Sequence, residues 1–198
     1  MRDDYVVRVP RGYGRLRFSR EEIPHILLSL GVLTLAFAIV FASFVASQAG
    51  EGMVVGFIYS LGLSLLIVLT GFFLHEMGHK FVAQRYGAWA EFRSYPFGLI
   101  MALVFSFLGF VFAAPGAVYI QGAITRRQNG YISLAGPAIN LGVGGVFMGA
   151  WLLAPDLGLL TTVLFLLGTV NGLFAVFNLL PIPPLDGSKV LRWNPVVY

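Results

Sequence analysis

The residues best suited to chemistry by type and spacing are in the segment HEMGH at positions 75–79. Residues four apart on a helix project from the same face, so the imidazoles of His75 and His79 can reach one zinc ion. Glu76 lies beside them and can take a proton from a water molecule at that ion. The alternative is coincidence, expected on the order of once in a thousand such chains. The spacing therefore predicts a zinc site with a general base.

A catalytic zinc ion needs a third protein ligand. The chain has no cysteine, and its remaining histidine, His25, starts an apolar run, where an interfacial role is the simpler interpretation. The acidic residues further along are Glu91, Asp156 and Asp186. Asp186 stands out because the prolines of PIPPLDG at 181–187 unwind the chain after an apolar run, which leaves a carboxylate on irregular backbone at membrane depth. The alternative is an exposed aspartate in a turn that ends a helix.

The composition indicates what must position these residues. Hydrophobic residues make up 58% of the 198 residues and charged residues 11%, against about 25% charged in a soluble domain. This excludes a soluble globular enzyme, a disordered chain and a disulfide scaffold. The net charge of +4 comes mostly from the first twenty residues, which favours contact with a lipid bilayer and argues against nucleic acid as a partner.

Apolar runs divide the chain into predicted membrane helices. A bilayer-spanning helix needs about 20 residues, and four runs are long enough: Ile26–Ala46, Met53–Leu74, Leu134–Ala154 and Leu157–Leu180. A fifth run, Phe97–Ala114, is shorter and lies between two prolines. We expect an all-α polytopic membrane protein with about four transmembrane helices and one re-entrant or non-spanning apolar segment. Residues 1–22, with six arginines, form a basic cytoplasmic arm, and residues 23–198 form a single domain.

Two connections between the apolar runs suit strands. Gly87–Tyr95 alternates in polarity and predicts a β-strand at the membrane surface. The stretch Ala117–Ser133 begins with AVYIQGAIT and contains Asn129-Gly130, a strong signal for a hairpin turn. We therefore expect a small surface β element beside the helices.

The predicted topology follows from closing the metal site. With the basic arm in the cytoplasm, the second run brings HEMGH back to the cytoplasmic side, and Asp186 must end at the same depth. Phe97–Ala114 must then begin and end on one side of the membrane. In this arrangement all 13 basic residues are cytoplasmic. We expect an integral protein of a prokaryotic plasma membrane with its active site toward the cytoplasm.

Three segments of the chain resemble motifs of a known family. HEMGH and the later NLLPIPPLDG are similar to segments of the site-2 proteases, which are intramembrane zinc metalloproteases, and GPAIN at 136–140 looks like that family's G-P-x-x-N element. The similarity covers about residues 65–192. The resemblance implies that one Zn²⁺ per chain is held by His75, His79 and Asp186, and that Glu76 is the catalytic base. It also implies that Asn140 contacts substrate or the oxyanion; a hydrogen bond between helices is the equal alternative.

The expected function is therefore zinc-dependent cleavage of transmembrane segments in membrane-protein substrates. An edge strand at Gly87–Tyr95 would hold an unwound substrate segment. One alternative is a membrane metalloprotease that cuts soluble chains; those usually take a later glutamate as third ligand, and no glutamate follows Glu91. Another is a non-proteolytic homologue that binds zinc or substrate without cleavage, although the intact Glu76 argues against it. The physiological substrate and the oligomeric state stay open. Asn171 and Asn178 either line the cleft or bond backbone between helices.

Overall fold

The computed structural model describes residues 16–111 and 114–198, so most of the expected basic arm lies outside the described residues. Within them, four helical segments are long and apolar enough to cross a membrane. They are α1 (Glu22–Ala49), the continuous segment α2–η1–α3 (Met53–Arg85), α5 (Arg126–Leu153) and α6 (Leu159–Leu179). The expected polytopic helical architecture is confirmed.

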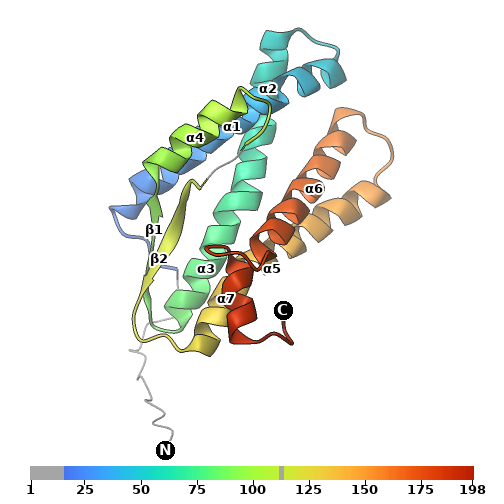
Figure 1. Cartoon of the computed structure of the whole chain (residues 1–198). Helices are drawn as coiled ribbons and strands as arrows, with labels where there is room; N and C mark the ends of the chain where they lie inside the picture. The colour runs from blue at the N-terminus through green and yellow to red at the C-terminus, as the bar shows by residue number, and fades with distance from the viewer. Residues whose placement is uncertain (1–15, 112–113) are drawn as a thin grey trace, which may run out of the picture.

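The helices form two antiparallel pairs that place the chemistry at one end. The α1–α2 and α5–α6 connections lie together at one end of the molecule, whereas the start of α5 and the short helix α7 (Asp186–Trp193) lie at the other (Figure 1). The end of α3 (Leu74–Arg85) also lies at that second end. HEMGH and Asp186 therefore meet at the same level of the bundle, as closing the metal site requires.

The second membrane segment changes its winding just before the histidines. It is an α-helix over Met53–Ile67 and a π-helix, η1, over Val68–Phe73, and it returns to α-helix at Leu74. One extra residue in a helical turn rotates the residues that follow by about 100° relative to an unbroken α-helix. The segment thus packs on α1 before the irregularity and on α5 after it.

Glycines bring α3 and α5 into close contact. A Cβ atom at Gly78 would lie 2.6 Å from Cδ1 of Ile139, and a Cβ atom at Gly136 would lie 2.5 Å from Nε2 of His79. Small residues at a helix crossing let two backbones approach, which is how membrane helices maximise their van der Waals contact. The crossing places the imidazoles directly against the backbone of α5.

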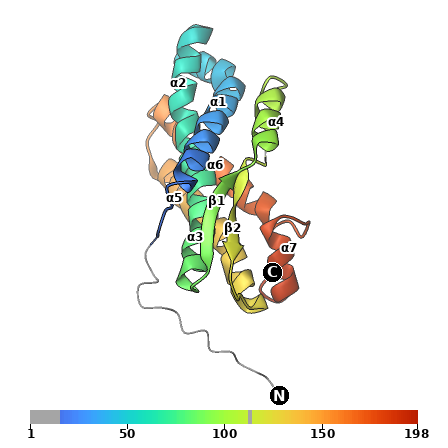
Figure 2. The same ribbon diagram turned by 90° about the vertical axis from the view of Figure 1, so that its left-hand side faces the viewer.

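A two-stranded antiparallel sheet lies beside α3 (Figure 2). Strand β1 (Trp89–Ser94) pairs with β2 (Gly116–Gln121) so that Trp89 is opposite Gln121 and Ser94 is opposite Gly116. Strand β1 lies within the segment Gly87–Tyr95 that the sequence indicated, and β2 begins one residue before the segment Ala117–Ser133. The small β element is confirmed.

The hairpin turn expected at Asn129-Gly130 is wrong. Both residues lie inside α5, which begins at Arg126, eight residues before the apolar run. The helix starts there because Thr125 and Gln128 form a capping box that satisfies the first free backbone N–H groups. Gly130 instead lets Trp193 pack against α5, because the ring of Trp193 occupies the place that a side chain at residue 130 would take.

The apolar segment between the strands is a hairpin that does not span. Helix α4 (Pro96–Ser106) has only 11 residues, about half the length needed to cross a bilayer. The backbone N–H of Tyr95 donates to the carbonyl of Pro115 at 3.0 Å, so the segment leaves and returns at one point. Leu99 and Ala102 pack α4 against α1. The expected non-spanning segment is confirmed.

A buried ion pair fixes the sheet to the helices. Lys80 and Glu22 are both fully buried, with Nζ 2.8 Å from Oε2. The ammonium group of Lys80 also donates to the carbonyl of Ala90 at 2.6 Å, and the backbone N–H of Phe92 donates to Oε1 of Glu22 at 2.9 Å. The outer edge of β1 is therefore bonded to α1 and α3, which sets the sheet's position relative to the adjacent His79.

Candidate metal centre

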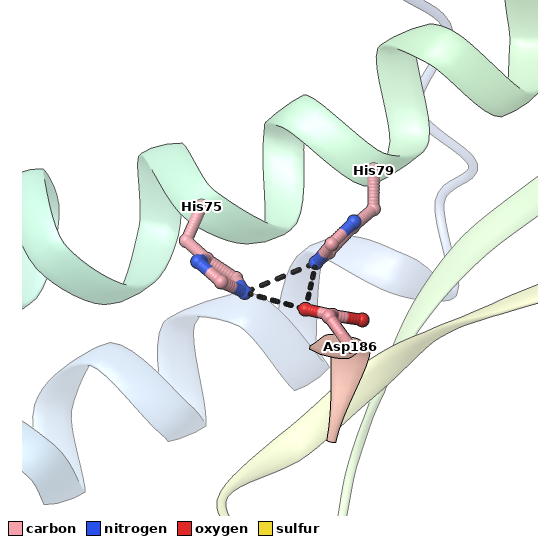
Figure 3. Close-up of side chains that lie close together, drawn as sticks. All are labelled: His75, His79 and Asp186. Atoms are coloured by element: carbon pink, nitrogen blue, oxygen red, sulfur yellow. Dashed lines mark hydrogen bonds and ion pairs between the residues drawn. The ribbon is translucent and has the colours of Figure 1, made fainter. Parts of the chain in front are cut away.

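The three ligands proposed from the sequence converge on one point. His75 and His79 project from one face of α3, and Asp186 meets them from the first residue of α7 (Figure 3). The two Nε2 atoms are 3.0 Å apart, and Oδ2 of Asp186 lies 3.3 Å from Nε2 of His75 and 3.1 Å from that of His79. Ligand atoms around a tetrahedral zinc ion are about 3.3 Å apart. The spacing of this buried cluster fits zinc.

Hydrogen bonds at the far side of each ring decide which nitrogen faces the cluster. Nδ1 of His79 is 2.7 Å from the carbonyl oxygen of Ile132, and Nδ1 of His75 is 2.5 Å from Oδ1 of Asn140. Both partners accept, so a neutral imidazole carries its one proton on Nδ1 and presents a lone pair at Nε2. Two lone pairs and a carboxylate oxygen then face each other without a donor between them. A cation satisfies all three acceptors, and a His₂-carboxylate set suits zinc.

The chain around Asp186 brings its carboxylate to the histidines. The prolines at 181–184 follow α6, and Gly187 lets the first turn of α7 press against the carbonyl of Leu179, where a Cβ atom would overlap it. Lys189 contacts Oδ1 at 3.2 Å, which leaves Oδ2 for the imidazoles. The positive charge of Lys189 beside Oδ1 favours the ionised form of the Asp186 carboxyl. An ionised carboxylate is the form that can bind a metal ion.

Glu76 lies beside the cluster and is oriented by the sheet. The backbone N–H of Val118 in β2 donates to its Oε2 at 3.0 Å. Among the described residues no donor bonds to Oε1. One carboxylate oxygen is thus held in place, and the second remains for a proton.

A cavity of about 540 Å³ contains the candidate metal centre and Glu76. Its polar part holds the three candidate ligands with Lys189, and its walls continue to apolar side chains of α1 and α6, among them Leu33, Phe37 and Phe174. Residues Gly116 to Val118 of β2 form another wall. The site therefore joins ionisable groups to a space that can take apolar side chains.

Asn140 supports the cluster from behind. It is fully buried and lies outside the cavity lining. Its Oδ1 accepts from His75, and its amide nitrogen donates to the carbonyl of Gly71 at 2.8 Å and to Oδ1 of Asn171 at 3.0 Å. Both amide protons are committed, so neither is left for an oxyanion. Of the two roles that the sequence left open, these contacts support the hydrogen bond between helices.

The other polar residues singled out from the sequence take different places. His25 bonds to Oγ of Ser94 at 2.7 Å and lies outside the cluster of His75, His79 and Asp186. Asn178 lines the cavity and bonds to the carbonyl of Phe174 in its own helix. Asn171 is fully buried and bonds to Asn140.

Sequence reasoning named Gly136 only as part of GPAIN, without its contact to the histidines, and it missed Lys189. A Cβ atom on Gly136 would lie 2.5 Å from Nε2 of His79 and 2.7 Å from Nε2 of His75, so only glycine fits there. A glycine inside a helix costs about 1 kcal/mol relative to alanine, which was a signal that packing requires it. The signal for Lys189 was its position three residues after Asp186 on one helix face.

Comparison with known proteins places these features in a family. The family model described as Peptidase family M50 matches residues 153–194, which include Asp186. A candidate zinc metalloprotease of Methanocaldococcus jannaschii is 40% identical over 184 residues, which are 92% of this chain and 89% of that protein. Candidate zinc metalloproteases of Mycolicibacterium smegmatis and Synechocystis sp. are 33% and 30% identical over 67% and 85% of this chain. The chain spans 58% and 39% of those two proteins.

No solved structure matches the chain with statistical significance. The relationship therefore rests on sequence and on the geometry of the site. The archaeal relative is similar over nearly its whole length, and the HEMGH and PLDG motifs supply the three converging side chains. This chain belongs to peptidase family M50, the family of the site-2 proteases.

Proposed function

We propose that this protein is a zinc-dependent endopeptidase that cleaves transmembrane segments of membrane-protein substrates. The observation that carries the proposal is the convergence of His75, His79 and Asp186 beside Glu76, in a cavity walled by membrane-spanning helices. These three side chains would hold one zinc ion per chain. When bound, zinc supplies a Lewis acid and lowers the pKa of a water molecule from about 15.7 toward about 7.

Glu76 is the general base of the proposed reaction. Its carboxylate takes a proton from the water that attacks the substrate carbonyl, and it then gives this proton to the leaving amine. The hydrogen bond from Val118 holds Oε2, so the carboxylate keeps its orientation through both transfers. A positioned base of this kind contributes about 10²–10⁴-fold to the rate.

The strand that would hold the substrate is β2. The sequence suggested Gly87–Tyr95, but the outer edge of β1 is already bonded to Glu22 and Lys80. On β2, the N–H of Val118 points away from β1 to Glu76, so the outer edge of β2 faces the base. An unwound substrate segment paired with this edge would lie with its peptide bonds beside Glu76. Pairing would also satisfy the backbone groups that the substrate exposes when its helix unwinds.

The orientation in the membrane is part of the proposal. In the described part of the chain no basic residue lies in the α1–α2 or α5–α6 connection, so the positive-inside rule assigns the opposite end, which contains the metal centre, to the cytoplasm. The matching relatives come from Methanocaldococcus, Mycolicibacterium and Synechocystis, all of them prokaryotes. We therefore propose a prokaryotic plasma membrane with the active site toward the cytoplasm.

Cleavage assays with two substrates test this function. Purified protein in liposomes is given a model transmembrane segment and, separately, an unfolded soluble peptide, with Glu76→Gln as the control. We expect mass spectrometry to find cleavage inside the transmembrane segment with the wild type only. Cleavage of the soluble peptide alone would support a surface metalloprotease instead, and cleavage of neither would support a binding homologue.

A further inference from the structure

A chain of hydrogen-bonded polar side chains continues from His75 into the helix bundle. Thr70 of η1 accepts from the amide nitrogen of Asn171 at 3.1 Å. Oδ1 of Asn171 accepts from Asn140 at 3.0 Å, and Oδ1 of Asn140 is 2.5 Å from Nδ1 of His75. We call the path Thr70–Asn171–Asn140–His75 the amide relay. It crosses from η1 to α6 and α5 and returns to the helix that carries the histidines.

The two asparagines of the relay are fully buried among apolar helices. Polar side chains at such depth are costly and call for a function. Hydrogen bonds that only attach one helix to another would not need a fixed orientation of each amide, because a carboxamide can bond to its neighbours in either of two orientations. The relay instead has a single direction.

Backbone carbonyl groups set that direction, because they can only accept. The carbonyl of Leu167 accepts from the amide nitrogen of Asn171 at 2.9 Å, which turns Oδ1 of Asn171 toward Asn140. The carbonyl of Gly71 accepts from the amide nitrogen of Asn140 at 2.8 Å, which turns Oδ1 of Asn140 toward His75. Each amide in the relay therefore has one orientation that satisfies all its bonds.

The remote end of the relay is fixed in the same way. The hydroxyl of Thr70 donates to the carbonyl of Leu66 at 2.7 Å, so its lone pair is available to the amide nitrogen of Asn171. Reversal of the Asn171 amide would set its oxygen against the carbonyl of Leu167, acceptor against acceptor. The bonds of Thr70 thus support the orientation that reaches His75 two amides away.

We propose that Asn171 and Thr70 are positioning residues for the metal centre. They hold the Asn140 amide with its oxygen on Nδ1 of His75, so that the ring presents Nε2 to the metal. Neither residue touches the metal or the substrate. The inference rests on the proposed function, since it takes His75 as a zinc ligand. Asn140 bonds directly to His75, and partners in that position typically affect metal affinity by about 10–100-fold; Asn171 and Thr70 act through Asn140.

The test compares Asn171→Leu with Ser60→Ala. Leucine has a similar size and removes all bonds of the Asn171 amide. Ser60 is also fully buried and bonds across a helix contact to the carbonyl of Ala38 at 2.9 Å, but it is not part of the relay. We expect chelator competition to show zinc affinity about 10–100-fold weaker in Asn171→Leu and unchanged in Ser60→Ala. In zinc-free protein with ¹⁵N-labelled histidine, NMR should show one tautomer of His75 in the wild type and two in Asn171→Leu.

A second pair keeps the test decisive if Asn171→Leu does not fold. Thr70 is half-buried, and Thr70→Val removes its hydroxyl with little change of shape, whereas Thr70→Ser keeps it. We expect Thr70→Val to weaken zinc binding and mix the tautomers, and Thr70→Ser to match the wild type. A folded Asn171→Leu, or a Thr70→Val, with wild-type affinity and a single tautomer would overturn the inference. Failure of the wild type itself to bind zinc would contradict the proposed function instead.

Discussion

Gly136→Ala brings a single methyl group into the metal centre. Its Cβ atom would lie 2.5 Å from Nε2 of His79 and 2.7 Å from Nε2 of His75, so both rings must move. Extra atoms in a well-packed interior cost about 1–3 kcal/mol. In the zinc-free protein the rings can turn away and avoid part of this cost, but bound zinc fixes them. If the cost falls on the zinc-bound state, the affinity for zinc drops by about 5–150-fold.

The control for this prediction is Gly142→Ala, six residues along the same helix. A Cβ atom at Gly142 meets no atom within 4 Å, so this variant should bind zinc as the wild type does. Both changes raise helix propensity, so circular dichroism should find both variants folded. Zinc affinity is measured by competition with a fluorescent chelator. Equal affinities in Gly136→Ala and Gly142→Ala would refute the contact between α5 and the imidazoles.

Three further predictions address the ligands, the sheet and the topology. Metal analysis should find that Asp186→Ala loses tight zinc binding and that His25→Ala keeps it. Zinc retained in Asp186→Ala and lost in His25→Ala would show that the proposed ligand set is wrong. Glu22→Ala leaves Lys80 buried without its carboxylate and should lower the free energy of unfolding by about 3–5 kcal/mol. In thermal unfolding, the double variant Glu22→Ala/Lys80→Met should recover most of this loss; if it recovers none, an unpaired Lys80 is not the cause of the instability. Single cysteines at Tyr95 and Gln128 should label from the same side of the membrane, whereas labelling from opposite sides would contradict the non-spanning α4 hairpin.

The parts of the site that depend on local geometry were predictable from the sequence. The i, i+4 spacing places His75 and His79 together on any α-helix, whatever surrounds it. The prolines before Asp186 marked the turn that follows α6, but the expectation of irregular backbone at Asp186 itself was wrong, because this residue is the first of α7. The apolar runs gave the spanning helices because length and hydropathy alone determine them. The same requirement that HEMGH and Asp186 meet also predicted the non-spanning segment.

Features that depend on packing between distant segments were not predictable. Asn129-Gly130 was interpreted as a turn because a local signal favoured it, but the capping box at Thr125 and the ring of Trp193 decided for a helix. The orientation of Asn140 depends on carbonyl groups of other helices. The edge of the sheet that remains open depends on the Lys80–Glu22 pair, whose members are 58 residues apart. Nothing in the local sequence encodes these contacts.

The most direct test of the central claim is zinc content and proteolysis measured on the same preparations of wild type and Glu76→Gln. Glutamine keeps the size of Glu76 and leaves all three ligands in place, but it cannot take the proton. We expect one zinc ion per chain in both proteins, with cleavage of a transmembrane substrate reduced by at least about 10²–10⁴-fold in Glu76→Gln. Near-normal cleavage by Glu76→Gln, or a wild type that cleaves without zinc, would contradict it.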